Sequence, residues 1–111
     1  NTEVGIETKF KNLQYPCMIS TTGIRELRGL GFDSQGALII GGAVTLSSLE
    51  HYLAAAESTQ KGGLRAIFDM LRWFASGQIR NVAVLAGNIV TASPISDLNP
   101  VLMAIGASVT L

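Results

Sequence analysis

Residues 37–50 read Ala-Leu-Ile-Ile-Gly-Gly-Ala-Val-Thr-Leu-Ser-Ser-Leu-Glu, and this stretch decides the fold class. Its first eight residues are apolar apart from two glycines, which predicts a strand buried on both faces. The hydroxyl side chains that follow are typical of a helix start. Ser47 and Glu50 have the spacing of a capping box, in which each side chain satisfies a free backbone donor of the first turn. We therefore expect a strand and a helix in direct succession.

Residues 64–75 carry the clearest helical pattern of the chain. Apolar residues recur at the spacing of one helix face, and charged residues occupy the opposite side, which predicts an amphipathic helix packed on a core. Gly77 is expected to end this helix. Its apolar face consists of Leu64, Ile67, Phe68, Leu71, Phe74 and Ala75, and the preceding helix presents Leu49, Tyr52, Leu53 and Ala56.

The remaining elements are predicted from weaker signals. Asp97 or Asn99 is expected to cap a short final helix, with Pro100 in its first turn and Gly106 at its end. Strands mixed with helices, without regular alternation, predict an α+β fold with a mixed or antiparallel sheet flanked by helices. The expected extended segments are residues 2–10 (after an opening turn), 14–19, 79–85 and 107–111, and the expected turns are residues 21–27, a single helical turn ending near Gly29, and 33–36.

The composition limits the classes of function. Of the 111 residues 48% are hydrophobic and 14% charged, and the charged share lies below the roughly 25% usual in soluble domains. Eight basic and eight acidic residues cancel, so no long-range field favours nucleic acid or an anionic membrane. No apolar run approaches the ~18 residues of a membrane span. We therefore expect one domain at most, without a nucleic-acid or membrane partner. We also expect part of the surface of this domain to be covered by further chain.

The single cysteine and the single histidine exclude several kinds of site. Cys17 has no partner for a disulfide within the chain, and the several soft ligands of a structural zinc or iron–sulfur site are missing. We expect Cys17 to be a small buried side chain and His51 to be exposed on a helix. No Ser-His-Asp or Cys-His arrangement can be assembled around His51, so no catalytic or metal-binding residue is predicted.

Neutral polar residues are concentrated in residues 85–100. Asp97 is the only charged side chain between Asn81 and Leu111, and we expect a segment so poor in charge to form an interior wall. Its amide and hydroxyl groups suit phosphate oxygens, and a lone carboxylate suits a pair of sugar hydroxyls. Two alternatives remain: Gly87-Asn88 also fits a tight turn, and Asp97 a helix N-cap. Thr91, Ser93 and Ser96 can serve a ligand or satisfy local backbone.

These residues alone point to a wall for an anionic ligand, because neither a Rossmann Gly-x-Gly-x-x-Gly motif nor a P-loop is present. Longer motifs narrow the class. In these longer motifs the chain resembles the FAD-binding region of the xanthine dehydrogenase family. The members of this family are eukaryotic molybdenum hydroxylases. The motifs are Asn-Thr-Glu-Val-Gly-Ile-Glu (residues 1–7), Lys-Phe-Lys (9–11), Arg-Trp-Phe-Ala (72–75), Gln-Ile-Arg-Asn-Val-Ala (78–83) and Gly-Asn-Ile-Val-Thr-Ala-Ser-Pro-Ile-Ser-Asp-Leu-Asn-Pro-Val (87–101).

The resemblance covers essentially the whole chain and is loosest over residues 21–63. It implies a PCMH-type flavin-binding domain, similar to that of vanillyl-alcohol oxidase and built from two subdomains. Residues 1–111 are then expected to be a single fragment of that domain, truncated at both ends and inactive alone.

The same resemblance implies an electron path. In the family, electrons from the oxidation of hypoxanthine or xanthine pass through two 2Fe–2S clusters to FAD, and then to NAD or oxygen. The molybdopterin and the clusters are expected in other domains of the same chain. The full-length protein is expected to be a homodimer in the cytoplasm or the peroxisome. The alternatives are the FAD domain of a related aldehyde oxidase and a degenerate flavin-fold module that serves only packing or partner contact.

The resemblance also implies which residues hold FAD. The loop that contains residues 1–4 wraps the pyrophosphate with backbone donors, and Asn88 faces the diphosphate and ribityl region. Asp97 is implied to contact the sugar portion, and Phe74 to pack beside the flavin nucleotide. The implied cofactor-binding residues are Asn1, Thr2, Glu3, Val4, Phe74, Val84, Leu85, Ala86, Gly87, Asn88, Thr91 and Asp97.

Two positions depart from the family pattern. Where the family usually has Ser-x-Gly-Gly-Asn, this chain has Val84-Leu85-Ala86-Gly87-Asn88. Val84 lacks a hydroxyl that could bind FAD, and the methyl group of Ala86 is tolerated only where the backbone keeps φ negative and the cofactor leaves room. We therefore expect weaker FAD retention than in a relative with the usual pattern.

Overall fold

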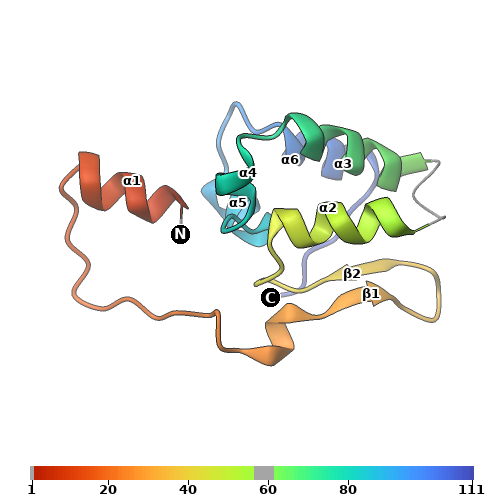
Figure 1. Cartoon of the computed structure of the whole chain (residues 1–111), viewed down its shortest axis with the longest axis horizontal. Helices are drawn as coiled ribbons and strands as arrows, with labels where there is room; N and C mark the ends of the chain where they lie inside the picture. Colours follow the sequence, from red (N-terminus) through yellow and green to blue (C-terminus); the bar gives the residue numbers. More distant parts are fainter. Residues whose placement is uncertain (1, 57–61) are drawn as a thin grey trace.

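The computed structural model describes residues 2–56 and 62–111, which form an α+β fold with a small two-stranded sheet (Figure 1). This confirms the predicted fold class, and the sheet is antiparallel. The elements in chain order are α1 (Thr2–Phe10), η1 (Arg25–Arg28), β1 (Leu30–Phe32), β2 (Leu38–Ile40), α2 (Leu46–Ala55), α3 (Gly62–Trp73), α4 (Gly77–Arg80), α5 (Leu85–Thr91) and α6 (Leu98–Ala104).

The hairpin of β1 and β2 packs one face against the helices. Leu30 pairs with Ile40 and Phe32 with Leu38. The predicted turn over residues 33–36 is confirmed, with the Asp33 carboxylate accepting from the backbone N–H of Gln35 at 2.8 Å. The strand predicted over residues 37–44 is shorter and only half buried, because Leu38 and Ile40 face the core while Ile39 is exposed.

Gly41 lies where the chain leaves β2 and passes close to the backbone before β1. A Cβ atom at Gly41 would lie 2.3 Å from the carbonyl oxygen of Leu27, whereas a Cβ at the neighbouring Gly42 would have ordinary contacts at 3.9 Å. We expect Gly41→Ala to destabilise the hairpin by about 2 kcal/mol, because a backbone atom cannot yield as a side-chain tip can. Gly42→Ala is the matched control, expected to be neutral or to stabilise by up to about 1 kcal/mol.

Hydrogen exchange of the β1, β2 and α2 amides measures both effects in the full-length protein. Equal protection in the Gly41→Ala and Gly42→Ala variants would contradict the close approach of Gly41 to Leu27.

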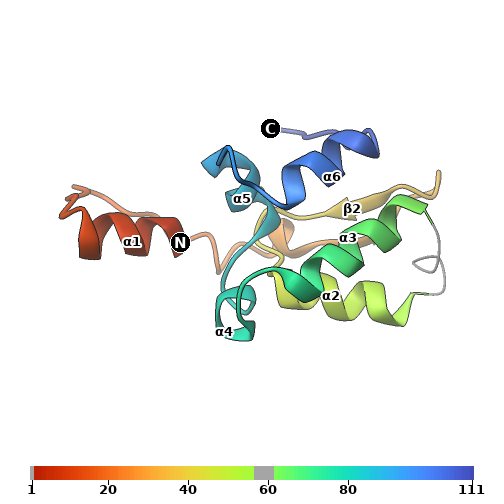
Figure 2. The same cartoon turned by 90° about the horizontal axis from the view of Figure 1, so that it is seen from above.

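The core lies between the helices and the inner face of the hairpin. Helices α2 and α3 lie side by side, and α6 packs on α3 and α5 (Figures 1 and 2). The predicted apolar faces of residues 49–56 and 64–75 supply much of this packing, which confirms both helices. The buried core residues are Val44, Leu46, Leu49, Leu53, Ile67, Leu71, Ala83, Leu85 and Leu98.

The helix boundaries differ from the predicted ones for local reasons. Thr45 is the N-cap of α2 and accepts from the N–H of Ser48 at 3.1 Å, so the predicted capping box of Ser47 and Glu50 is wrong. Both side chains bond to distant partners instead. Helix α3 ends at Trp73 because Ala75 takes a left-handed conformation (φ 46°), and Gly77 starts α4 where it was expected to end the helix before it.

Three predicted extended segments are wrong. Residues 2–10 form α1, whose Glu3 and Lys9 have the signs that a helix dipole favours at its two ends. Residues 77–80 form α4, leaving only a short extended link in which Val84 pairs with Thr45 as an isolated bridge. Residues 107–111 form no strand and are exposed.

Two predictions about single side chains have opposite outcomes. His51 is exposed, as predicted. Cys17 is exposed, so the prediction of a buried thiol is wrong. Cys17 lies in a segment without helix or strand, in which the neighbouring Ile19 is 84% exposed.

The predicted final helix is confirmed with a different cap. Pro100 lies in the first turn of α6, and Gly106 ends the helix region with a positive φ of 71°. Asp97 occupies the N-cap position but makes no side-chain capping bond. The hydroxyl of Ser96 accepts from the N–H of Asn99 in its place, at 3.2 Å.

No helix within residues 2–56 and 62–111 is both long and apolar enough to cross a membrane. The same residues contain no cluster of three or more His, Cys, Asp or Glu side chains suited to a metal ion.

Candidate functional site

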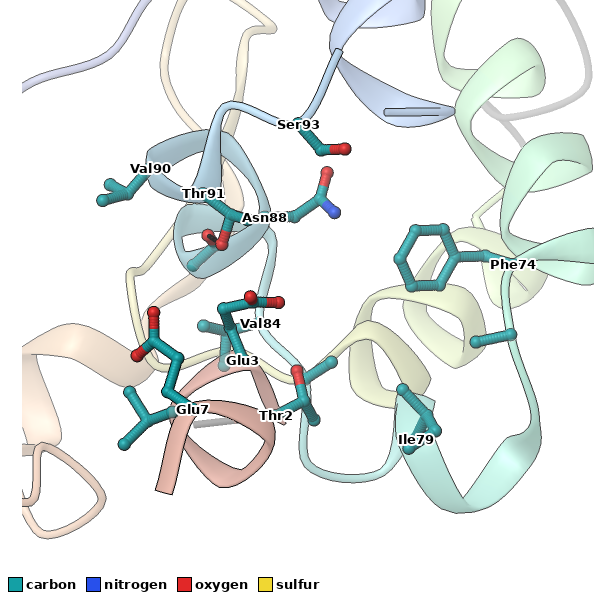
Figure 3. A pocket seen from close by; sticks show the side chains of 14 residues that line it. Thr2, Glu3, Glu7, Phe74, Ile79, Val84, Asn88, Val90, Thr91 and Ser93 are labelled. Atoms are coloured by element: carbon teal, nitrogen blue, oxygen red, sulfur yellow. Dashed lines mark hydrogen bonds between the residues drawn. The ribbon is translucent and has the colours of Figure 1, made fainter. Parts of the chain in front are cut away.

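A cavity of about 680 Å³ lies between three segments that are far apart in the sequence (Figure 3). The first wall is the start of α1, the second is the turn between α3 and α4, and the third is the link into α5 together with α5 itself. The lining residues are, wall by wall, Thr2, Glu3, Val4 and Glu7; then Phe74, Ala75 and Ile79; then Ala83, Val84, Gly87, Asn88, Val90, Thr91 and Ser93.

The structure brings most of the predicted site residues into this one cavity. Those that line it are Thr2, Glu3, Val4, Phe74, Val84, Gly87, Asn88 and Thr91. The prediction for Asn1 lies outside the described residues. The first and third walls are about 80 residues apart in the chain, so the cavity joins the two motifs on which the predicted site rests.

Three predicted residues are not among the cavity lining. The Leu85 side chain is 6% exposed because it packs into the core. Ala86 lies in the first turn of α5 with an ordinary helical backbone, and a Cβ at Gly42 would touch its methyl group at 3.9 Å. Asp97 is exposed at the start of α6.

Residues 85–100 are not the interior wall that their low charge suggested. Leu85 and Leu98 are buried, but Val90 is 81% and Ile95 86% exposed. The segment forms a short helix, an exposed turn and the start of α6, and only one side of α5 faces the cavity. Gly87-Asn88 lies inside α5, so the alternative of a tight turn there is wrong.

The first wall combines the backbone amides at the N-terminus of α1 with two carboxylates. Helix α1 begins at Thr2, and the first N–H groups of a helix have no partner within it. Glu3 forms an exposed ion pair with Lys11 at 3.7 Å. Glu7 accepts a hydrogen bond from the Tyr15 hydroxyl, and this bond raises the pKa of Tyr15 because it favours the protonated phenol.

The second wall is held in place by Arg80. Its Nη1 donates to the carbonyl oxygens of Phe74 at 2.8 Å and Ala75 at 3.0 Å. Its Nε donates to the Glu50 carboxylate at 3.1 Å, and the two side chains are only 17% and 22% exposed. Arg80 therefore ties the left-handed turn at Ala75, and the Phe74 ring beside the cavity, to helix α2.

The third wall presents neutral polar groups from α5. The Asn88 side chain points into the space between the walls (Figure 3), and its Oδ1 accepts from the hydroxyl of Ser96 at 3.2 Å. The Thr91 hydroxyl donates to the carbonyl oxygen of Gly87 at 2.9 Å, which leaves it as an acceptor toward the cavity. Val84 is the N-cap of α5 and makes no side-chain capping bond.

The donor set suits a ligand with an anionic part, hydroxyl groups and a flat apolar part. No lysine or arginine occurs among the described residues that line the cavity. Negative charge must therefore be bound by backbone N–H groups and neutral side chains, as at other helix N-termini. The carboxylates of Glu3 and Glu7 suit hydroxyl groups, and the Phe74 ring offers an apolar face.

Several lining residues were missed in the sequence. Ala75 and Ile79 lie inside two of the quoted motifs, and Glu7 ends the first one, so a closer reading of those motifs could have included them. Val90 lies in the middle of the longest motif. Nothing in the sequence shows the contact of Arg80 with Phe74 and Glu50, because the ion pair joins residues 30 positions apart.

Comparison with known proteins assigns the whole chain to one kind of domain. The model of a family described as the FAD-binding domain in molybdopterin dehydrogenase matches residues 1–111. A xanthine dehydrogenase/oxidase of Gallus gallus is 51% identical over 115 residues, which cover 100% of this chain. A xanthine dehydrogenase of Oryza sativa subsp. japonica is 49% identical over 97% of the chain, and a xanthine dehydrogenase/oxidase of Mus musculus 47% identical over 100%. The chain spans about 8% of the length of each of these relatives.

Proposed function

Because the chain belongs to the family of FAD-binding domains in molybdopterin dehydrogenases, we propose that its three-walled cavity binds FAD. The single observation that supports this most strongly is the meeting of residues 2–7 and 84–93 at one cavity. Both segments belong to the motifs on which the resemblance to the family rests, and neither could hold a dinucleotide alone.

The residues present fit the cofactor. A cavity of about 680 Å³ falls within the roughly 300–1,000 Å³ of small-molecule sites. The free amides of the first turn of α1 and the Asn88 amide are neutral donors suited to phosphate oxygens. The Phe74 ring is suited to pack on a flat ring system, and Glu3, Glu7 and Thr91 to accept from ribityl or ribose hydroxyls.

The role of this chain is to bind and orient. When bound, FAD would supply the capacity to take up electrons and pass them on. Asn88 and the first turn of α1 would hold its polar middle part, and Phe74 would exclude water from one side of the ring system. Asn1, Leu85, Ala86 and Asp97 remain proposed contacts that rest on the resemblance alone.

We further propose that the full-length protein is a xanthine dehydrogenase. The relatives named above support this over an aldehyde oxidase, since their names specify xanthine dehydrogenase. The proposal includes hypoxanthine or xanthine as substrate, NAD or oxygen as acceptor, and molybdopterin and two 2Fe–2S clusters in other domains. A PCMH-type domain of two subdomains, a homodimer, and a cytoplasmic or peroxisomal location belong to the same proposal.

Val84 offers a test of how tightly the cavity retains FAD. It is the N-cap of α5 but has no hydroxyl to bond a free N–H of the first turn. Val84→Ser or Val84→Thr should cap α5, worth about 1 kcal/mol. Because position 84 lines the cavity, we expect the new hydroxyl also to reach the cofactor and to raise FAD affinity about tenfold.

The FAD content of the full-length protein after gel filtration measures the gain. Val84→Ala is the control, since it removes methyl groups without adding a hydroxyl. Ala86→Gly should give a smaller gain than the new hydroxyl at position 84, because Ala86 has a helical backbone and its methyl group is not among the cavity lining. Unchanged FAD content in the serine and threonine variants would overturn the assigned role of position 84.

A further inference from the structure

We propose that Ser96 is a positioning residue, which acts through Asn88 and not by touching the ligand. Its hydroxyl holds the Asn88 amide so that the nitrogen faces the cavity and the oxygen faces away. The inference rests on the proposed FAD site, because it specifies which groups of the cofactor Asn88 can bind.

Two hydrogen bonds connect the start of α6 to Asn88 through Ser96. The backbone N–H of Asn99, in the first turn of α6, donates to the hydroxyl oxygen of Ser96 at 3.2 Å. The Ser96 hydroxyl donates to Oδ1 of Asn88 at 3.2 Å. The Ser96 oxygen thus accepts one bond, from Asn99, and its single proton is donated to Asn88, so the hydroxyl links the backbone of α6 to the Asn88 amide.

Ser96 itself is held in place by the turn between α5 and α6. Its N–H donates to the carbonyl oxygen of Ser93 at 3.1 Å, which closes the turn between α5 and α6. Ser96 and Asn88 are both partly buried, so water competes less for the bond between them than at an open surface. The relay therefore transfers the rigidity of the α6 N-terminus to a side chain of α5.

The two ends of the Asn88 amide have different surroundings. With Oδ1 engaged by Ser96, Nδ2 makes no hydrogen bond to another described residue and is available to a ligand. Figure 3 shows the nitrogen of Asn88 on the side of Phe74 and the oxygen on the side of Ser93. A reversed amide would present a carbonyl oxygen to the cavity and would repel phosphate oxygens. By holding the Asn88 amide in this orientation, the Ser96 hydroxyl favours a ligand that presents acceptor groups to Nδ2.

Ser96 also caps α6, so a loss of stability must be separated from a loss of orientation. A double-mutant cycle of Ser96→Ala and Asn88→Ala in the full-length protein separates the two, with the dissociation constant of FAD as the first readout. Hydrogen exchange of the α6 amides is the second readout, because loss of the cap alone changes it whether or not Asn88 is present. Ser96→Thr keeps the hydroxyl and serves as the conservative variant.

We expect Ser96→Ala to weaken FAD binding roughly three- to tenfold in the presence of Asn88, and to have no further effect in the Asn88→Ala background. Ser96→Thr should restore the affinity. An unchanged dissociation constant, or an equal loss in both backgrounds, would overturn the inference, even where α6 is destabilised. If Asn88→Ala weakens binding and Ser96→Ala does not, only the positioning role fails. If Asn88→Ala leaves binding unchanged, the assigned Asn88 contact fails as well.

Discussion

Replacing Arg80 with alanine is expected to destabilise the packing of α2, α3 and α4, lowering the free energy of unfolding of this region by about 3 kcal/mol. The substitution leaves the Glu50 carboxylate without its partner, at a position where only 22% of that side chain is exposed. It also removes the donor from the carbonyl oxygens of Phe74 and Ala75. The turn that carries the Phe74 ring should loosen, and FAD retention should fall with it.

Hydrogen exchange of the α2 and α4 amides in the full-length protein measures this change. Arg65→Ala is the matched control. Arg65 pairs with Asp69 at 2.8 Å on the exposed side of α3, and this pair lowers the pKa of the Asp69 carboxyl. Because such exposed pairs contribute little, we expect the Arg65→Ala variant to lose much less stability than the Arg80→Ala variant. Similar losses for the two arginines would contradict the structural role assigned to Arg80.

Replacing Asn88 with alanine is expected to weaken FAD binding about ten- to hundredfold, the range for loss of one hydrogen bond to a charged group. Asn88 is the lining residue whose amide points between the walls, and no described lysine or arginine lines the cavity to compensate for it. Fluorescence titration of the FAD-free, full-length protein measures the dissociation constant.

Asn81→Ala provides the control for this change. Asn81 is exposed and bonds to the Ser47 hydroxyl at 2.7 Å, outside the cavity. Its replacement should leave FAD affinity unchanged. Equal affinities of the Asn88→Ala variant and the unchanged protein would show that α5 does not contact the cofactor.

Helices α2 and α3 could be predicted because their apolar faces pack on the core. Leu49, Leu53, Ile67 and Leu71 repeat at helical spacing, and all four are buried. Helix α1 could not be predicted in this way, since it has no buried residue and hence no apolar periodicity. Its β-branched residues favour extended chain and its glycine disfavours a helix, which explains the wrong prediction.

The short elements also lack the apolar periodicity that made α2 and α3 predictable. Residues 79–85 look like a strand, but Ser76 caps a single turn of helix there and accepts from the N–H of Ile79 at 3.4 Å. The exposed position of Cys17 could not be foreseen from the apolar residues around it, because exposure is decided by the placement of the whole segment.

Many residues of the site could be predicted from the sequence, but the way in which they are arranged and supported could not. Polar groups in residues 85–100 indicated an anionic ligand, and the resemblance joined them to residues 1–7. The supports of the site were not visible. Glu50 and Arg80 meet across 30 positions, and Ser96 reaches Asn88 across eight, through side-chain hydrogen bonds that no local pattern records.

We propose that residues 2–7, the Phe74 turn and α5 together enclose FAD. A structure of the full-length protein with FAD bound tests this most directly. We predict the diphosphate between the first turn of α1 and Nδ2 of Asn88, with the ring of Phe74 packed against the cofactor. FAD bound elsewhere in the protein, with this cavity filled by solvent or by another segment, would contradict the account.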